Sequence, residues 1–300
     1  MKRRDFFAAT GLASLTPLIS SIGDFEYSSS DYMMGYQLYS IRDKMATDPI
    51  DTIKSLKTFG YRDFEIYGYD VNTDSIYGMS SSEFRLILDG EGLTATSGHY
   101  GFSDYLLANN DQLKKFVDGC LTCAQTLGSD YITWPWLAPE YRTLESFKIM
   151  IDKLNIIADH LDGSGMGFAY HNHGFEFEIT DGDQTGYDLI INNTDPALVK
   201  LQMDMYWVMH SAKVTPQKLV EENKGRFVMW HIKDMDTLTR DYTEVGNGSI
   251  NYLNLLPSAE DSGLQYYYLE QGGNFAIDSL QSAKTSAKYC QENLTSMITK

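Results

Sequence analysis

Short apolar runs alternate with amphipathic runs along most of the chain. The apolar runs are rich in β-branched and aromatic residues and predict strands at residues 33–40, 61–68, 93–101, 129–136, 165–173, 197–207, 225–234 and 264–273. The amphipathic runs have a helical period and cover residues 49–60, 80–92, 109–128, 144–165, about 186–193, about 215–223, 250–263 and 277–294. Each predicted strand is therefore followed by a predicted helix.

This alternation of eight strands and eight helices predicts an α/β fold, a single (β/α)8 TIM barrel over residues 31–300. An open, doubly wound sheet is the alternative arrangement. Such sheets commonly carry a glycine-rich phosphate loop of the GxGxxG type after a strand. None of the predicted strands is followed by such a loop, so the closed barrel is favoured.

Composition narrows the classes of partner. A chain of 300 residues with 43% hydrophobic content can bury a full core. Its 24 basic and 41 acidic residues give a formal charge of −17, which repels phosphate backbones and argues against nucleic acid as a partner. No apolar run approaches the roughly 20 residues of a membrane-spanning helix, so we expect no membrane span.

Residues 1–30 have the layout of an export signal and linker. Lys2, Arg3 and Arg4 precede a mildly apolar stretch with small residues, and the adjacent arginines before Asp5 resemble a twin-arginine signal. A frayed amphipathic N-terminus is the alternative interpretation. Because the twin-arginine route carries folded proteins, often with a cofactor already bound, we predict a bacterial, periplasmic protein.

Three cysteines cannot form a complete set of disulfides. Cys120 and Cys123 have helical spacing within a predicted helix, whereas a redox pair would stand at a helix N-terminus after a strand. We therefore expect both to be small core residues.

Polar and aromatic side chains gather where the predicted strands end. In a TIM barrel these ends meet at one mouth, where catalytic groups lie. The residues are Gln37, Tyr39, Arg42, Glu65, His99, Trp134, Trp136, His171, Asn172, His173, Asp204, His231, Lys233 and Glu270. Four of the six histidines are among them, and this concentration indicates a functional site.

Each of these residues also has a structural interpretation. A lone histidine can bond a loop carbonyl, a tryptophan usually packs in the core, and Glu65 can orient Arg42. Asp204 can cap the next segment, and Glu270 can pair with a lysine. Several buried carboxylates with few cations would nevertheless be costly. One divalent metal ion, Mn²⁺, Zn²⁺, Co²⁺ or Mg²⁺, removes this cost because carboxylate and imidazole donors suit it.

The strand ends resemble those of the sugar phosphate isomerase/epimerase family, which belongs to the xylose isomerase-like TIM barrels. The resemblance covers the chain from about Met33 onward and is carried, in order and spacing, by GYQLYSIRD, GYRDFEIYG, SGHYGF, YHNHGFEFE, MDMYW, HIKD and LEQ. It implies one divalent metal held by a glutamate after the fifth strand, an aspartate after the sixth, a histidine after the seventh and a glutamate after the eighth.

Carried over by position, the resemblance implies Asp204, His231 and Glu270 as metal ligands. The family's frequent aspartate-x-x-histidine after the sixth strand is altered here, because Trp207 stands at the histidine position. The multi-metal set of the related endonucleases is therefore incomplete. Together with the negative charge, this argues against DNA repair.

The fifth strand also departs from the family pattern. It ends in His171-Asn172-His173, where many members have a glutamate, and Glu176 follows three residues later. Either His171 takes the place of that glutamate, or Glu176 folds back to the metal. We favour Glu176, because a carboxylate would restore the usual ligand set.

The resemblance implies a metal-dependent sugar isomerase or epimerase that acts through an enediolate. Glu270, Glu176 or His173 would then be the base, and Lys233 would stabilise the developing oxyanion. We expect substrate contacts from Tyr39, Arg42, Glu65, His99, Trp134, His171 and Trp207.

Export argues against a phosphorylated substrate, so we expect a free sugar, a keto-sugar or an oxidised glycoside. A dehydratase or lyase of keto-sugars or 3-keto-glycosides would use the same enolate and is the alternative. A non-catalytic periplasmic sugar-binding barrel is a further alternative. Because helices on the surface of such barrels often form dimers, a homodimer is the expected assembly if the chain associates.

Overall fold

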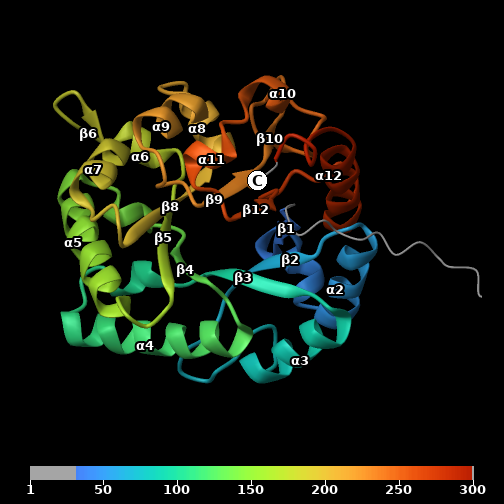
Figure 1. The fold of residues 1–300 in the computed structure, drawn as a ribbon, viewed down its shortest axis with the longest axis horizontal. Helices are drawn as coiled ribbons and strands as arrows, with labels where there is room; N and C mark the ends of the chain where they lie inside the picture. Colours follow the sequence, from blue (N-terminus) through green and yellow to red (C-terminus); the bar gives the residue numbers. More distant parts are fainter. Residues whose placement is uncertain (1–31, 299–300) are drawn as a thin grey trace, which may run out of the picture. The chain divides into compact units, whose positions relative to one another are not determined.

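Eight parallel strands close into a barrel within residues 32–298, the part of the chain that the computed structural model describes. Around the barrel the order is β1-β12-β9-β8-β5-β4-β3-β2, as Figure 1 shows. The strands are β1 Met34–Gln37, β2 Asp63–Tyr67, β3 Thr94–His99, β4 Tyr131–Trp134, β5 Gly167–His171, β8 Val199–Asp204, β9 Met229–Ile232 and β12 Tyr266–Leu269. The predicted (β/α)8 barrel is confirmed.

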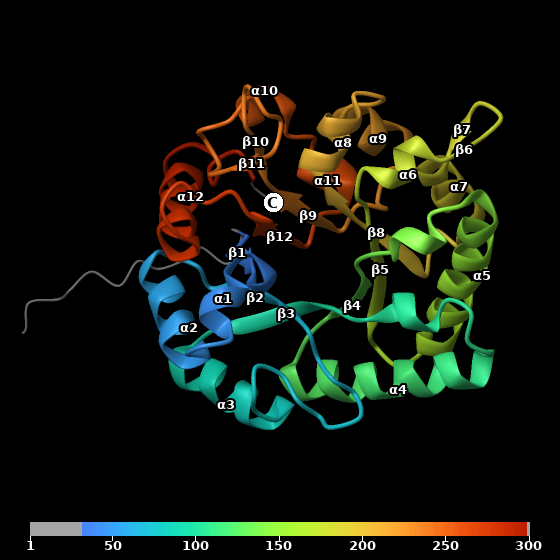
Figure 2. The same cartoon turned by 180° about the vertical axis from the view of Figure 1, so that it is seen from behind.

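Helices surround the barrel on its outer side, and the opposite view in Figure 2 shows the same arrangement. Those that follow the strands are α2 Pro49–Thr58, α3 Ser81–Glu91, α4 Asn110–Leu127, α5 Leu144–Leu161, α7 Gly186–Asn193, α9 Pro216–Glu222, α10 Tyr252–Leu255, α11 Ala259–Ser262 and α12 Ser279–Asn293. The predicted helix over 250–263 is thus two short helices. Pro257 stands between them, and a proline cannot supply the backbone N–H that a continuous helix needs.

Local sequence sets the ends of the long helices. Ser80 and Asn109 each form a capping box, in which the side chain three residues later bonds back to the cap residue. Gly92 and Gly128 end the same two helices in the left-handed conformation, with φ of 65° and 70°. Each N-cap contributes about 1 kcal/mol, so these helices begin and end where the sequence predicts.

The loops at the strand ends contain further short elements that the hydrophobic pattern did not predict. They are the 3₁₀ helices η1 Leu38–Ile41, η2 Phe102–Tyr105 and η3 Pro139–Tyr141, the helices α1 Arg42–Met45, α6 Phe175–Glu178 and α8 Met205–Ser211, and the hairpins β6 Thr180–Asp181 with β7 Gln184–Thr185 and β10 Asp234–Met235 with β11 Tyr242–Thr243. All eight predicted strands extend beyond the observed ones, most clearly where a short element begins. The strand over 165–173 stops at His171, and the strand over 197–207 stops at Asp204.

The expected roles of the cysteines are confirmed. Cys120 and Cys123 are buried, free thiols on α4, in the apolar layer between helices and strands. The predicted export signal lies outside the described residues. No helix in residues 32–298 is long and apolar enough to cross a membrane.

The inside of the barrel is layered. An apolar cluster of Tyr131, Ala169, Val228, Met229 and Tyr268 is separate from the main core. Beside it, buried Asp63 accepts hydrogen bonds from the Thr94 hydroxyl and from the hydroxyl and backbone N–H of Thr96. Burial outweighs these bonds and raises the pKa of Asp63 to about 6.

Asp63 should make the stability of the barrel depend on pH. Because its pKa is higher in the folded protein, the stability that it contributes is fully present below its unfolded pKa of about 4 and is lost as pH rises through about 6. We expect Asp63→Asn to gain about 3 kcal/mol relative to the wild type between pH 4 and pH 7, at roughly 1.4 kcal/mol per pKa unit. Urea unfolding across that range measures the difference. Asp152→Asn, at an exposed position on α5, is the control for charge removal, and parallel pH profiles for Asp63→Asn and wild type would contradict the assignment.

Candidate functional site

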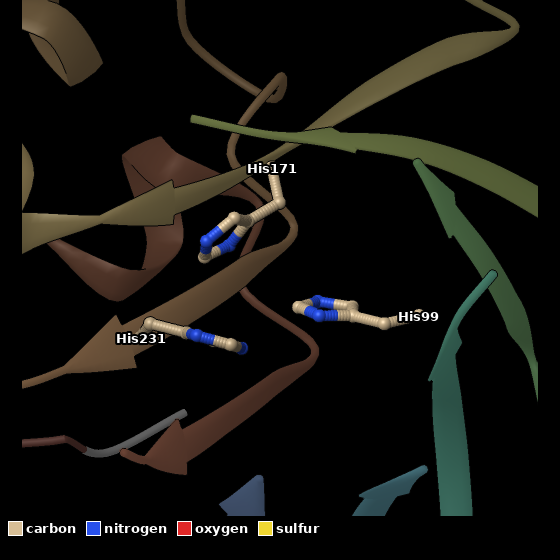
Figure 3. Close-up of side chains that lie close together, drawn as sticks. All are labelled: His99, His171 and His231. Atoms are coloured by element: carbon tan, nitrogen blue, oxygen red, sulfur yellow. The ribbon is translucent and has the colours of Figure 1, made fainter. Parts of the chain in front are cut away.

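Four titratable side chains meet at the mouth of the barrel. His171 ends β5, Asp204 ends β8, His231 lies in β9 and Glu270 directly follows β12. All four are buried, and one donor atom from each lies within 4.8 Å of the others. His99, at the end of β3, joins His171 and His231 in a second group, and Figure 3 shows the three imidazoles turned toward one another from separate strands.

The carboxylate of Glu65 on β2 lies against two of these histidines, His99 and His231. Its carboxylate is 2.6 Å from His231 Nε2 and 3.0 Å from His99 Nε2, and it accepts further hydrogen bonds from Gln37, Ser97 and Gln202. Burial opposes its ionisation, but the charges of His99 and His231 outweigh burial and hold the pKa of Glu65 well below its usual range. No hydrogen bond or ion pair joins Glu65 to Arg42, which donates to the carbonyls of Tyr39 and Gly272 instead, so the interpretation that Glu65 orients this arginine is wrong.

His231 is fixed at both ring nitrogens. Nε2 faces Glu65, and Nδ1 lies 2.5 Å from Glu270 Oε2. Burial alone would lower the pKa of His231, but the two carboxylates raise it to about 9. A carboxylate behind one nitrogen of an imidazole is the usual arrangement around metal-binding histidines, because it fixes the ring and its tautomer.

Lys233, two residues after His231, is buried between two carboxylates. Its Nζ lies 2.5 Å from Asp204 Oδ2 and 2.9 Å from Glu270 Oε1. Burial favours the neutral amine, but Asp204 and Glu270 outweigh it and raise the pKa of Lys233. The same lysine, with His231, overcomes burial and lowers the pKa of Glu270. Lys233 therefore supplies the positive charge that balances these two carboxylates.

Asp204 is placed by bonds between neighbouring strands. Asn172 accepts from the Asp204 backbone N–H at 2.9 Å, and its amide donates to the Asp204 carbonyl at 3.3 Å. The Asp204 side chain also accepts from the Trp207 N–H and caps α8. The capping role and the place in the cluster are thus compatible. At Gly174 a Cβ would lie 3.0 Å from the Trp207 ring, so the glycine lets this indole pack against the loop after β5.

Glu176, the preferred metal ligand after the fifth strand, does not lie in this cluster, whereas His171 does. Glu176 lies on the short helix α6 and folds back locally, where both its oxygens accept from the His173 N–H at 2.9 Å and one also accepts from the Tyr170 hydroxyl at 2.7 Å. Burial raises the pKa of Glu176 to about 7. It is absent from the cluster, where His171 contributes instead, because the chain turns into a helix at Gly174.

The donor set fits a divalent cation. His171 is buried, burial keeps its pKa well below the usual value, and its Nδ1 has no hydrogen-bond partner among the described residues. The neutral imidazole is the form that binds metal. Three carboxylates, Glu65, Asp204 and Glu270, meet at this cluster, and among the described residues Lys233 is the one lysine or arginine that pairs with them, so negative charge is available for a further cation.

A cavity of about 1000 Å³ opens above this cluster. Of the predicted substrate-binding and catalytic residues, the structure places Tyr39, His99, His171, His173, Trp207, Lys233 and Glu270 in its lining. Residues that sequence reasoning missed are Tyr67, Tyr69, Tyr100, Arg142, Phe175, Phe177, His210 and Tyr242. Most of these lie on irregular loops or short helices, where no periodic pattern marks them. Gln202 was also missed, although it lies two residues before Asp204 and therefore on the same side of the strand.

Three predicted substrate contacts, Glu65, Trp134 and Arg42, do not line the cavity. Glu65 is fully buried beneath His99 and His231. Trp134 is fully buried, stacks on Phe102 and donates its indole N–H to the Trp136 carbonyl, so it is a core residue. Trp136, which is 40% exposed, lines the cavity in its place. Arg42 lies over the Tyr39 ring and donates to the carbonyls of Tyr39 and Gly272. It thus joins the first and last loops of the barrel and does not line the cavity.

Removing Lys233 should expose the cost of the buried carboxylates. We expect Lys233→Met to lower the free energy of unfolding by about 3–5 kcal/mol, because Asp204 and Glu270 lose their counter-charge. Urea unfolding in the presence of a chelator measures this loss. Lys213→Met, at an exposed lysine that lines the same cavity, should change stability by no more than about 0.5 kcal/mol. Equal losses in the two variants would contradict the proposed charge balance.

Comparison with known proteins agrees with this architecture. The barrel is similar to a sugar phosphate isomerase/epimerase from Parabacteroides distasonis, with a TM-score of 0.77 and 24% identity over 93% of this chain and 99% of that chain. It is similar to the IOLI protein with a binding zinc atom, with a TM-score of 0.68 and 14% identity over 88% and 98% of the two chains. A third similar structure is the probable 3-DHS dehydratase AsbF from Bacillus anthracis, with a TM-score of 0.64 and 12% identity over 86% and 98%.

At these identities the solved structures show the shared fold. No curated protein matches the sequence significantly. The model of the xylose isomerase-like TIM barrel family matches residues 53–289, which is most of the chain and includes β2 to β12. The chain therefore belongs to the xylose isomerase-like TIM barrel family.

Proposed function

We propose that this protein is a metal-dependent sugar isomerase or epimerase that acts through an enediolate on a free sugar, a keto-sugar or an oxidised glycoside. The observation that carries the proposal is the buried group of His171, Asp204, His231 and Glu270 at the floor of a large cavity. The likeness to a sugar phosphate isomerase/epimerase and to a zinc-containing barrel supports it.

His171, Asp204, His231 and Glu270 would hold the metal. When bound, a divalent ion such as Mn²⁺, Zn²⁺, Co²⁺ or Mg²⁺ supplies Lewis-acid charge, which acidifies the C–H next to a carbonyl and favours the enediolate. Glu65 keeps His231 in one orientation through Nε2. Lys233 lines the cavity and lies beside the same carboxylates, so its ammonium can donate to the oxygen on which negative charge develops.

His173 is the best placed of the three candidate bases. Burial keeps its pKa well below the usual value, so the ring is neutral and can accept a proton. It lines the cavity, and its Nδ1 has no partner within the described part of the chain. Glu270 is already engaged by His231 and Lys233, and Glu176 does not line the cavity. The bond from the His173 N–H to Glu176 makes Glu176 a positioning residue.

The cavity favours a substrate without a phosphate group. Its lining cations are Arg142, Lys213 and Lys233. Lys233 is neutralised by two carboxylates, and Arg142 lies over the Phe175 ring and donates to the Leu137 carbonyl. No cluster of free cations is left among the described residues of the lining. A periplasmic location, proposed from Lys2 to Arg4, agrees with an unphosphorylated sugar.

Elimination is the second candidate reaction. A dehydratase or lyase would form the same enolate and then lose a β-substituent, and the likeness to a probable dehydratase supports keeping this alternative. A non-catalytic sugar-binding barrel would need the aromatic lining but not the buried carboxylate and imidazole groups.

Metal content tests the ligand assignment. Protein purified without added metal should contain about one Mn, Zn or Co per chain by elemental analysis, in line with a single site of four donors. Asp204→Ala and His171→Ala should lose that metal, whereas Glu176→Gln should keep it. Retention in His171→Ala with loss in Glu176→Gln would restore Glu176 as the ligand, and absence of metal from every protein would contradict the metal-dependent mechanism.

Exchange of a substrate proton tests the chemistry. In D₂O the wild type should introduce deuterium next to the carbonyl of an unphosphorylated keto-sugar or 3-keto-glycoside, and mass spectrometry detects the product. His173→Ala should slow the exchange by roughly 10²- to 10⁴-fold, the usual contribution of a general base. His160→Ala, at a histidine on α5 paired with Asp118, is the matched control. If no candidate sugar exchanges and no product forms, the enolate mechanism is wrong for these substrates.

A further inference from the structure

The cavity is larger than the proposed reaction requires. Its volume of about 1000 Å³ is at the upper end of the roughly 300–1,000 Å³ typical of drug-sized ligands. A single sugar ring is smaller than such ligands, and the reacting groups occupy only the floor, where His171, Lys233 and Glu270 lie. The remaining space can accommodate a further part of the ligand.

The space above the floor lies between two aromatic walls. Tyr67 ends β2 and Tyr69 follows it. Trp207 follows β8, which lies four places away from β2 in the closed order of eight strands and therefore across the barrel. Aromatic faces are suited to the C–H faces of sugar rings, since both present an apolar surface. Two facing walls can hold one ring between them or one ring against each.

The second wall continues from Trp207 through His173 and Phe175 to Trp136 in a row of ring and guanidinium contacts. The guanidinium of Arg142 lies 4.1 Å from the ring centre of Phe175 and 5.4 Å from that of Trp136, and its Nε donates to the Leu137 carbonyl. Trp136 is 40% exposed although it belongs to this packed group, and it lines the cavity, so part of it is accessible to a ligand.

Two polar atoms on the second wall have no hydrogen-bond partner among the described residues. The indole N–H of Trp207 and Nδ1 of His173 are both buried, belong to residues that line the cavity, and form no hydrogen bond within residues 32–298. Buried polar atoms normally have a partner, because an unpaired one is costly. His173 serves the reacting ring in the proposed mechanism. The N–H of Trp207 is a donor only, so the partner that it lacks is an acceptor such as a hydroxyl oxygen.

We propose that the cavity binds a glycoside of two sugar rings. The first ring lies on the floor beside His171, Lys233 and Glu270, an assignment that rests on the proposed function. The second ring lies against Trp136 and Trp207, with a hydroxyl oxygen on the Trp207 N–H. The substrate class is therefore a disaccharide or its oxidised form, in preference to a monosaccharide.

Binding of unreactive sugars to the full chain tests this proposal. By isothermal titration calorimetry, cellobiose should bind about tenfold more tightly than methyl β-D-glucopyranoside, which lacks the second ring. Phenyl β-D-glucopyranoside, whose second ring has no hydroxyl groups, should lie between them. These binding measurements do not depend on turnover. A protein that fails the deuterium exchange test can therefore still show the expected order of affinities.

Variants separate the two features of the second wall. Trp136→Ala should reduce the preference for cellobiose to less than about twofold, because the stacking face is lost. Trp207→Phe keeps an aromatic ring but removes the donor, so it should weaken cellobiose about three- to tenfold and leave the phenyl glucoside unchanged. Leu86→Ala, at an exposed residue of α3 outside the cavity, should keep the tenfold preference.

Three results would overturn the proposal. The first is equal affinity of the wild type for cellobiose and the methyl glucoside. The second is a failure of cellobiose to bind at millimolar concentration. The third is a preference for cellobiose that survives in both tryptophan variants. If the phenyl glucoside binds more tightly than cellobiose, the second ring is an aromatic group and the two-sugar assignment is wrong.

Discussion

Buried negative charge is the constraint on which the mouth of this barrel depends. Glu65, Asp204 and Glu270 are buried within one small region, and removing a carboxylate from water is costly unless an opposite charge or several donors replace the solvent. Positive partners supply this compensation. His231 lies between Glu65 and Glu270, and Lys233 lies between Glu270 and Asp204. These contacts join β2, β8, β9 and β12 into one electrostatic unit.

This electrostatic unit fixes the orientation of the side chains in the site. Because His231 is held at both nitrogens and Glu65 has five hydrogen-bonding neighbours, none of these side chains can turn away from the centre of the barrel. A rigid floor of this kind can hold a cation and a sugar in one relative orientation. The loops above the floor carry the aromatic residues, so the titratable groups and the aromatic lining belong to different parts of the fold.

The prediction from sequence succeeded where physical periodicity marks the chain. Strand and helix positions followed from alternation, caps and glycines, and the strand-end rule collected Asp204, His231 and Glu270 before any contact was known. The prediction failed where a short helix changes the direction of the chain. The run after His171 resembles a strand by composition, yet Phe175–Glu178 is a helix, and this turn removes Glu176 from the site. Trp134 and Trp136 are neighbours of identical type, and only the packing of Phe102 decides that Trp134 is core.

The sequence by itself determined the closed alternation of strands and helices, the side of the barrel where the cluster of titratable groups lies, and the residue types that gather there. These properties depend on local propensity and on the geometry that all parallel barrels share. Only the tertiary structure decided that His171 and not Glu176 joins the cluster, that Lys233 lies between Asp204 and Glu270, and that aromatic walls surround a large cavity. Such features depend on distances between residues far apart in the chain, and no local pattern encodes these distances.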